Sequence, residues 1–371
     1  MKKNLKTVFA SVLVAALLAS TTLGLTACGG GGEKDPVPTE PSEVVELRTF
    51  TDSLGREVRV PVEIERVAAL SSTSEQVLIT MAPDMMVGLC QAMSEDEKLF
   101  LGEELSALPV LGSYYNAKGD FNKESVAAAN PQVIIDMGEK KNGIEEDLES
   151  LQAQLAIPVV FIETSLDGYD EAYRTLGELL GLPERGNQLD DYCAAAWSET
   201  ESVMATIPEN ERVNMLYLLG DAGLNIIPAN SFQSGVIDIV ANNLAVVENA
   251  KGGGQGMESS LEQIALWNPE LIVFGPNSVY SSVADMPAWK GIDAIDSGTY
   301  FEVPSEPYSW LNNPPTVNQI LGLQWLPRVC YPHAYDDDLK QVVTEYYQLF
   351  YGYQLSDAEY DELVEGALPL K

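Results

Sequence analysis

One fourteen-residue pattern occurs twice in this chain, at residues 122–135 and again at residues 260–273. Each copy begins with a residue suited to cap a helix, Asn122 or Ser260, and carries a glutamate two positions later, Glu124 or Glu262. An Asn-Pro pair then stops the helix, because a residue before proline disfavours the α region, and an apolar run follows. The repeat predicts two lobes of related build, each with a short helix leading into a buried strand.

Short apolar runs alternate with helical stretches on both sides of residues 183–207. Such alternation is typical of parallel β/α units with helices on both faces of the sheet. The expected strands are residues 67–70, 86–89, 133–136 and 159–162, then 213–219, 246–247, 271–274 and 300–303.

Residues 183–207 have helical composition and no strand signal, so they predict one long helix between the lobes. Residues 45–61 form two alternating runs around Gly55 and predict a β-hairpin, and residues 336–363 predict terminal helices. The predicted fold class is therefore α/β, with two Rossmann-like lobes bridged by one long α-helix.

The first thirty residues have the order of an export signal. Lys2, Lys3 and Lys6 precede an apolar run, and small residues lead to Leu-Thr-Ala-Cys, which ends at Cys28. This ending resembles the lipobox of bacterial lipoproteins, which implies cleavage before Cys28 and lipidation of its thiol; an ordinary secreted protein is the alternative. Acyl chains would hold the protein at the cell membrane on its extracytoplasmic face.

A Gly- and Pro-rich acidic stretch follows, and it predicts a flexible tether. The expected organisation is a signal peptide at 1–27, a tether at 28–46, an N-terminal lobe at 47–182, a bridging helix at 183–207 and a C-terminal lobe at 208–371.

Charge and residue usage exclude several classes of function. The formal net charge of −35 at pH 7 would repel nucleic acid and anionic lipid. The single histidine, His333, and the widely spaced Cys90, Cys193 and Cys330 argue against a zinc site built by the protein. We expect buried free thiols, with one disulfide plus one free thiol as the alternative. No motif for a nucleophile with its base is present, so we predict no catalytic residues, no metal site, no cofactor and no enzyme activity.

Several further segments carry a family resemblance. They are the hairpin with Asp52, Gly55 and Arg56, the paired Glu-to-Asn-Pro units, residues 325–332 and residues 350–352. Together they resemble the periplasmic-binding-protein family that serves ABC importers of iron-siderophores, haem and cobalamin. The resemblance covers about residues 47–365. It implies a monomer whose ligand sits in a cleft between the lobes, with an ABC permease and its ATPase as partners.

Loops at the carboxyl ends of strands bind ligands in open α/β sheets. The residues expected to contact the ligand are Ser72, Tyr114, Tyr115, Lys118, Lys140, Tyr308, Trp310 and Asn312. The aromatic members would suit a flat macrocycle or aromatic chelate, although each could instead pack against its own loop.

The resemblance also gives Glu124 and Glu262 a role, because one surface glutamate per lobe docks on the permease in this family. The alternative is that each only complements the dipole of its helix. The expected cargo is a metal chelate, either a ferric siderophore or a corrinoid. The scarcity of cations in the chain favours a weakly charged ligand such as the corrinoid.

Three different functions are also compatible with the sequence. Binding of haem is one, although the position of His333 argues against its ligating haem. A surface-anchored hydrolase with a carboxylate pair, such as a glycosidase, is another, and a purely adhesive lipoprotein is a third.

Overall fold

The computed structural model describes residues 45–115, 120–248 and 254–369. Residues 45–371 form one compact unit. The signal peptide, Cys28 and Lys118 lie outside the described residues, so the predictions made for them stay predictions.

The unit opens with the predicted hairpin. Strands β1 (Leu47–Thr51) and β2 (Glu57–Pro61) pair antiparallel. Gly55 adopts a φ of 82° in the turn, which favours glycine. Arg56 forms an ion pair with the buried Asp52 at 2.5 Å, and its guanidinium also donates to the carbonyl of Val159, so the turn is tied to the first lobe.

The first lobe contains a parallel sheet in the order β3-β4-β5, made of Val67–Ala69, Val133–Gly138 and Val159–Glu163. The strand expected at residues 86–89 is wrong, because this segment makes only isolated bridges, Val67 with Met86 and Leu89 with Val110. The helices of this lobe are α1 (Ser72–Met81), α2 (Glu95–Leu101), α3 (Glu103–Ser106), α4 (Lys123–Ala129), α5 (Ile144–Leu155) and α6 (Tyr169–Leu180).

The second lobe contains a sheet in the order β11-β10-β6-β7-β9, and β8 pairs with β6. Its strands are β6 (Asn214–Leu219), β7 (Asn225–Ile226), β8 (Asn242–Asn243), β9 (Met257–Glu258), β10 (Leu271–Phe274) and β11 (Tyr300–Glu302). The strand expected at residues 246–247 is wrong: the pairing falls on β8 instead, and Val246 is 73 % exposed. The helices here are α8 (Gly235–Val240), α9 (Leu261–Trp267), α10 (Asp293–Ser297), α11 (Gln319–Cys330), α12 (Leu339–Tyr346) and α13 (Asp357–Leu363).

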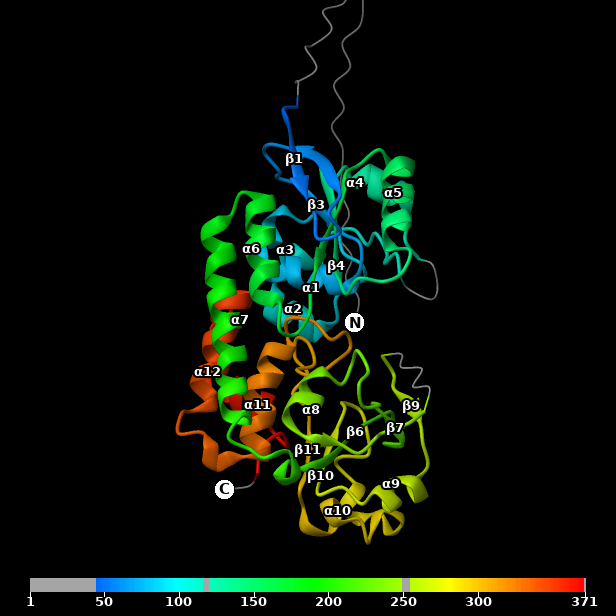
Figure 1. Cartoon of the computed structure of the whole chain (residues 1–371), viewed down its shortest axis with the longest axis vertical. Helices are drawn as coiled ribbons and strands as arrows, with labels where there is room; N and C mark the ends of the chain where they lie inside the picture. The colour runs from blue at the N-terminus through cyan, green and yellow to red at the C-terminus, as the bar shows by residue number, and fades with distance from the viewer. Residues whose placement is uncertain (1–44, 116–119, 249–253, 370–371) are drawn as a thin grey trace, which may run out of the picture. The chain divides into compact units, whose positions relative to one another are not determined.

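Helix α7 (Pro183–Met204) links the two lobes and runs past both sheets (Figure 1). It packs closely on α6 where Gly186 meets Gly177: a Cβ on Gly186 would lie 2.7 Å from the carbonyl oxygen of Tyr173. At its other end, Glu199 pairs with the buried Arg328 of α11 at 3.3 Å. Helix α7 is therefore held by specific contacts toward both of its ends.

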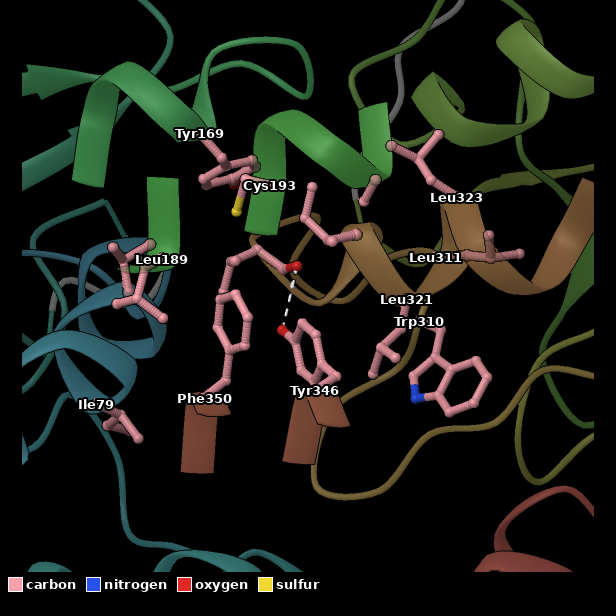
Figure 2. Close-up of a cluster of buried hydrophobic side chains, with 14 of the residues drawn as sticks. Ile79, Tyr169, Leu189, Cys193, Trp310, Leu311, Leu321, Leu323, Tyr346 and Phe350 are labelled. Atoms are coloured by element: carbon pink, nitrogen blue, oxygen red, sulfur yellow. Dashed lines mark hydrogen bonds between the residues drawn. The ribbon is translucent and has the colours of Figure 1, made fainter. Parts of the chain in front are cut away.

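One hydrophobic cluster extends through both lobes along α7. Figure 2 shows part of it, where Leu189 and Cys193 of α7 lie near Phe350 and Tyr346 of the C-terminal segment. The rings of Tyr346 and Phe350 stack with centroids 4.1 Å apart, and the Tyr346 hydroxyl donates to the carbonyl of Val317. Because the lobes share this core, they are joined by more than a single helix.

The cysteines of the described residues are free thiols: Cys90 and Cys193 are buried, and Cys330 is partly buried. His333 lies on an exposed turn, Pro332–Ala334, in the second lobe. Among the helices described, none is long and apolar enough to cross a membrane.

Candidate functional site

A cavity of about 450 Å³ lies where the first lobe's strands end and the second lobe faces them; we call it the cleft cavity. Its lining residues are Ser71, Ser72, Thr73, Ser113, Tyr115, Asp136, Met137, Gly138, Glu139, Lys141, Ile144, Phe161, Phe232 and Gln233.

The floor of the cleft cavity is the start of helix α1. After β3, the chain turns at Ser71, whose hydroxyl accepts a hydrogen bond from the backbone N–H of Ser74 at 3.2 Å. This cap starts the helix, so that Ser72 and Thr73 line the cavity. A helix N-terminus carries partial positive charge, and the hydroxyls of Ser72 and Thr73 add donors, so the floor of the cavity suits anionic oxygen atoms.

Asp136, near the end of β4, is a buried carboxyl group that also lines the cleft cavity, and it is only 1 % exposed. The Tyr115 hydroxyl donates to Oδ2 of Asp136 at 2.6 Å, and Ser74 Oγ lies 3.5 Å from Oδ1. Burial raises the pKa of Asp136 from 3.8 to about 6, opposed by the Tyr115 hydrogen bond and the charge of Lys141. Asp136 therefore changes charge just below neutral pH.

The exposed rim of the cavity combines an aromatic ring with a cation. Tyr115 is 42 % exposed, and Lys141 Nζ lies 5.4 Å from the centroid of its ring. Tyr114 supports Tyr115 edge-on, with centroids 5.2 Å apart. Such a rim offers both an apolar face and one positive charge to a solute.

The second lobe contributes Phe232, which is 46 % exposed, and Gln233. The turn that carries them is held by Ser234, whose hydroxyl accepts from Ser231 N–H at 2.9 Å and donates to Asp238. The cleft cavity thus has an aromatic side chain from each lobe, Tyr115 and Phe232.

A second cavity, of about 560 Å³, also lies between the lobes, and we call it the acidic cavity. Helix α1 contributes to both, because Ser72 and Thr73 line the cleft cavity and Gln76 lines the acidic cavity. Gln76 Oε1 also accepts a hydrogen bond from Thr316 of the second lobe, so the lobes touch at this point.

The residues expected to contact the ligand do not all line one cavity in the structure. Ser72 and Tyr115 line the cleft cavity, whereas Tyr308 lines the acidic cavity. Tyr114 packs against Phe121, with ring centroids 5.6 Å apart. Lys140 pairs with Glu163 at 2.8 Å and lines a different cavity, beside α6.

Trp310 and Asn312 are completely buried in this structure. Trp310 packs edge-on against Trp325 of α11, and Asn312 Oδ1 accepts from the Tyr217 hydroxyl at 2.8 Å. A solute in either cavity does not reach these two side chains without a rearrangement, and their role as ligand contacts stays a prediction.

Sequence reasoning missed two residues of the cleft cavity above all, Asp136 and Lys141. A signal for Asp136 was available, because it is a lone acid inside the apolar run of β4. Lys141 sits in a loop, where the sequence does not fix the direction of a side chain.

The two copies of the repeat have the same local structure. Asn122 caps α4 by accepting from Ser125 N–H, and Ser260 caps α9 by accepting from Gln263 N–H. Both helices end at an asparagine with left-handed φ, 51° at Asn130 and 46° at Asn268. Figure 1 shows α4 in the first lobe and α9 in the second.

Glu124 and Glu262 hold the second position of these helices and are both exposed. Hydrogen bonds to backbone N–H and to Ser260 lower the pKa of Glu262. The two carboxylates are therefore exposed to solvent at equivalent positions of the two lobes.

Comparison with known proteins decides the family. The sequence profile described as "Periplasmic binding protein" matches residues 103–307, more than half of the chain. The chain belongs to the periplasmic binding protein family. The family implies an extracytoplasmic location and a role in binding a solute.

Individual relatives agree on the fold. An ABC transporter solute-binding protein from Sulfurospirillum deleyianum is 27 % identical, with a TM-score of 0.78 over 86 % of this chain and 99 % of that one. A periplasmic solute-binding protein from Veillonella parvula is 23 % identical, with a TM-score of 0.70 over 86 % of this chain and 97 % of that one.

The molybdate-binding protein MolA of Haemophilus influenzae is 22 % identical over 82 % of this chain and 91 % of its own length. Its molybdate-bound structure has a TM-score of 0.64 and covers 83 % of this chain and 99 % of that one. Together with the family match, these relatives make the chain a solute-binding protein of an ABC transporter. The predicted family and fold class are confirmed.

Proposed function

We propose that the chain is a lipid-anchored binding protein that captures a compact metal complex in the cleft cavity and delivers it to an ABC permease. The observation that carries this proposal is the cleft cavity itself. It combines the start of α1, the buried Asp136 with the Tyr115 hydroxyl that donates to it, Lys141 and an aromatic side chain from each lobe.

The size of the cleft cavity bears on the cargo. About 450 Å³ falls in the lower half of the range of roughly 300–1,000 Å³ typical of small-molecule sites. A corrinoid is too large to be enclosed by a cavity of about 450 Å³. The volume therefore favours a smaller complex, such as an iron chelate, over the corrinoid that charge alone favours.

A second candidate cargo is a tetrahedral oxyanion such as molybdate. The hydroxyls of Ser72, Thr73 and Ser113 around the start of α1 support it, together with Lys141 and the likeness to MolA. The ionised form of Asp136 opposes it, so an oxyanion would bind best where Asp136 is protonated.

Haem ligation and catalysis receive less support. His333 does not line the cleft cavity, so nothing in the geometry favours its ligating haem there. In the described part of the chain no group of three or more metal-ligating side chains occurs, and the matched relatives are binding proteins. We retain the proposal of a non-catalytic protein.

Docking on the permease would use Glu124 and Glu262. Their exposure, their matched helical positions and their placement on separate lobes support this role. Membrane attachment would use Cys28, and labelling with a palmitate analogue should mark the wild type but not Cys28→Ser.

Two adjacent lysines provide the test of the site. Lys141 lines the cleft cavity, whereas Lys140 pairs with Glu163 outside it. Calorimetry should be run with molybdate, ferric siderophores, haem and cobalamin. For the solute that binds, we expect one site, an affinity at least tenfold weaker in Lys141→Ala, and an unchanged affinity in Lys140→Ala. Equal effects of the two variants would show that the solute binds elsewhere.

A further inference from the structure

The charged side chains that line the cleft cavity do not match those of an anion-binding site. Its described lining contains two carboxylates, Asp136 and Glu139, and one ammonium group, that of Lys141. When both acids are ionised, the lining therefore carries one net negative charge. A binding site and its solute have complementary potentials, so a solute with a negative charge of its own is at a disadvantage here.

Asp136 is the more buried of the two acids, and it retains capacity to accept hydrogen bonds. It is 1 % exposed, whereas Glu139 is exposed. Its Oδ2 accepts from the Tyr115 hydroxyl at 2.6 Å. Its Oδ1 lies 3.5 Å from Ser74 Oγ, which is longer than the roughly 2.5–3.0 Å usual for hydrogen bonds between oxygens. Because each carboxylate oxygen has two lone pairs, Asp136 can accept from a donor on the solute.

The surroundings of Asp136 favour its ionised form above neutral pH. Burial raises its pKa to about 6, whereas the Tyr115 hydrogen bond, the charge of Lys141 and the backbone N–H of Met137 act in the opposite direction. Above pH 7 the group is therefore mostly a carboxylate. A carboxylate removed from water gains most from charge-assisted hydrogen bonds, which a solute with N–H groups supplies.

Asp136 also lies beside the first turn of helix α1. Ser74, the neighbour of Oδ1, is the third residue of that helix. A carboxylate at this place is attracted by the positive end of the helix dipole, so Asp136 itself uses part of the potential that would attract an anion. The hydroxyls of Ser72 and Thr73 remain in the lining as neutral donors, which suit acceptor oxygens of low charge.

We propose that Asp136 determines the specificity of the cleft cavity: it selects an uncharged metal chelate of the amino-carboxylate class, which carries N–H groups, and disfavours bare oxyanions. This inference rests on the proposed function and names the class of its solute. The metal-bound amines would donate to Asp136, and the carboxylate oxygens would accept from Lys141 and from the hydroxyls at the start of α1. A metal ion withdraws electron density from the nitrogen it binds, which makes the N–H group a stronger donor.

A purely structural role for Asp136 makes a different prediction. If its charge served only to complement the dipole of α1, Asp136→Asn would destabilise the fold and shift the affinity for every solute in the same direction. Two probes separate these roles. Tris(glycinato)cobalt(III) is uncharged, does not exchange its ligands readily and carries N–H donors. Molybdate carries two negative charges and no N–H donor.

Calorimetry at pH 8 on the purified chain is the test. We expect the wild type to bind the cobalt chelate at one site and molybdate more weakly. Asp136→Asn should bind the chelate about tenfold more weakly, because charge-assisted hydrogen bonds are roughly twice as strong as neutral ones. The same variant should bind molybdate about tenfold more tightly, because a like charge has been removed. The matched control, Asp84→Asn, changes an exposed acid outside the cavity and should alter either affinity less than twofold.

Thermal unfolding establishes that each variant is folded. Three results would overturn the inference: no binding of the chelate to the wild type, unchanged affinities in Asp136→Asn, or a shift of both affinities in the same direction. The proposed function survives these results if another solute still requires Lys141. If no solute requires Lys141, the proposed function fails, and this inference fails with it.

Discussion

The Tyr115 hydroxyl donates to Oδ2 of Asp136 at 2.6 Å, and so links the exposed rim of the cleft cavity to a carboxyl group that is almost fully buried. A solute that contacts the Tyr115 ring therefore lies close to a group whose charge changes with pH. This pair also combines a residue that sequence analysis identified, Tyr115, with one that it missed.

Solute affinity should depend on pH through Asp136. Its pKa is raised by burial to about 6, so the carboxyl is neutral below that pH and ionised above it. An anionic solute should bind more weakly as the pH rises through about 6, because it then meets a second negative charge. Calorimetry between pH 5 and pH 8 would show this trend in the wild type. It should be absent in Asp136→Asn, and persistence of the full trend in that variant would exclude Asp136 as its source.

Stability should fall with rising pH because of Glu75. This side chain of α1 is 5 % exposed and accepts a hydrogen bond from the backbone N–H of Cys90, and burial raises its pKa from 4.5 to about 7. The folded state then binds more protons than the unfolded state between those values, so the free energy of unfolding falls across that window. The pKa shift of Glu75 corresponds to a loss of unfolding free energy on the order of 3 kcal/mol.

Urea unfolding at pH 5 and pH 8 measures this loss. Glu75→Gln keeps an acceptor for Cys90 but cannot ionise, so its unfolding free energy should fall much less between the two pH values. The exposed Glu149→Gln should behave as the wild type. Asp136 acts in the same direction between about 3.8 and 6, which leaves a small residual slope in Glu75→Gln. A slope equal to that of the wild type would refute the assignment.

The contact between α6 and α7 should be sensitive to a single methyl group. Gly186→Ala places a Cβ 2.7 Å from the carbonyl oxygen of Tyr173, which is backbone and cannot turn aside. Overpacking of this kind destabilises by about 1–3 kcal/mol. The adjacent, exposed Asn187→Ala should be neutral or slightly stabilising, because alanine favours helix. If denaturant midpoints of the two variants coincide, the bridging helix is packed less tightly than this structure shows.

Replacing the repeated glutamates, Glu124 and Glu262, should impair transport without weakening solute binding. Glu124→Ala with Glu262→Ala should reduce uptake in cells at least tenfold and leave solute affinity unchanged, because both residues are exposed and neither lines the cleft cavity. Glu149→Ala with Glu209→Ala serves as the control for lost surface charge. Normal uptake in the double variant would leave these acids as helix-end charges only, and a loss of solute affinity would mean that the cleft is misplaced.

Local signals made the framework predictable from sequence. The caps at Asn122 and Ser260 and the Asn-Pro stops act within a few residues, so the helices and strands of the repeat appear where the pattern places them. The short β8 and the bridges at Met86 and Leu89 depend on which neighbour the chain meets in space, and the pattern placed those strands wrongly.

The site was less predictable, because side-chain direction depends on tertiary packing. Lys140 and Lys141 are identical neighbours, yet one pairs with Glu163 and the other reaches the cleft cavity. Trp310 follows a strand, as ligand contacts do in open α/β sheets, but packing on Trp325 buries it.

Native mass spectrometry of the chain purified from its own host tests the central claim most directly. The account predicts one solute per chain, held non-covalently, chemically unaltered, retained by Lys140→Ala and lost from Lys141→Ala. A solute that Lys141→Ala retains as fully as the wild type, or one that the protein returns chemically changed, would contradict it.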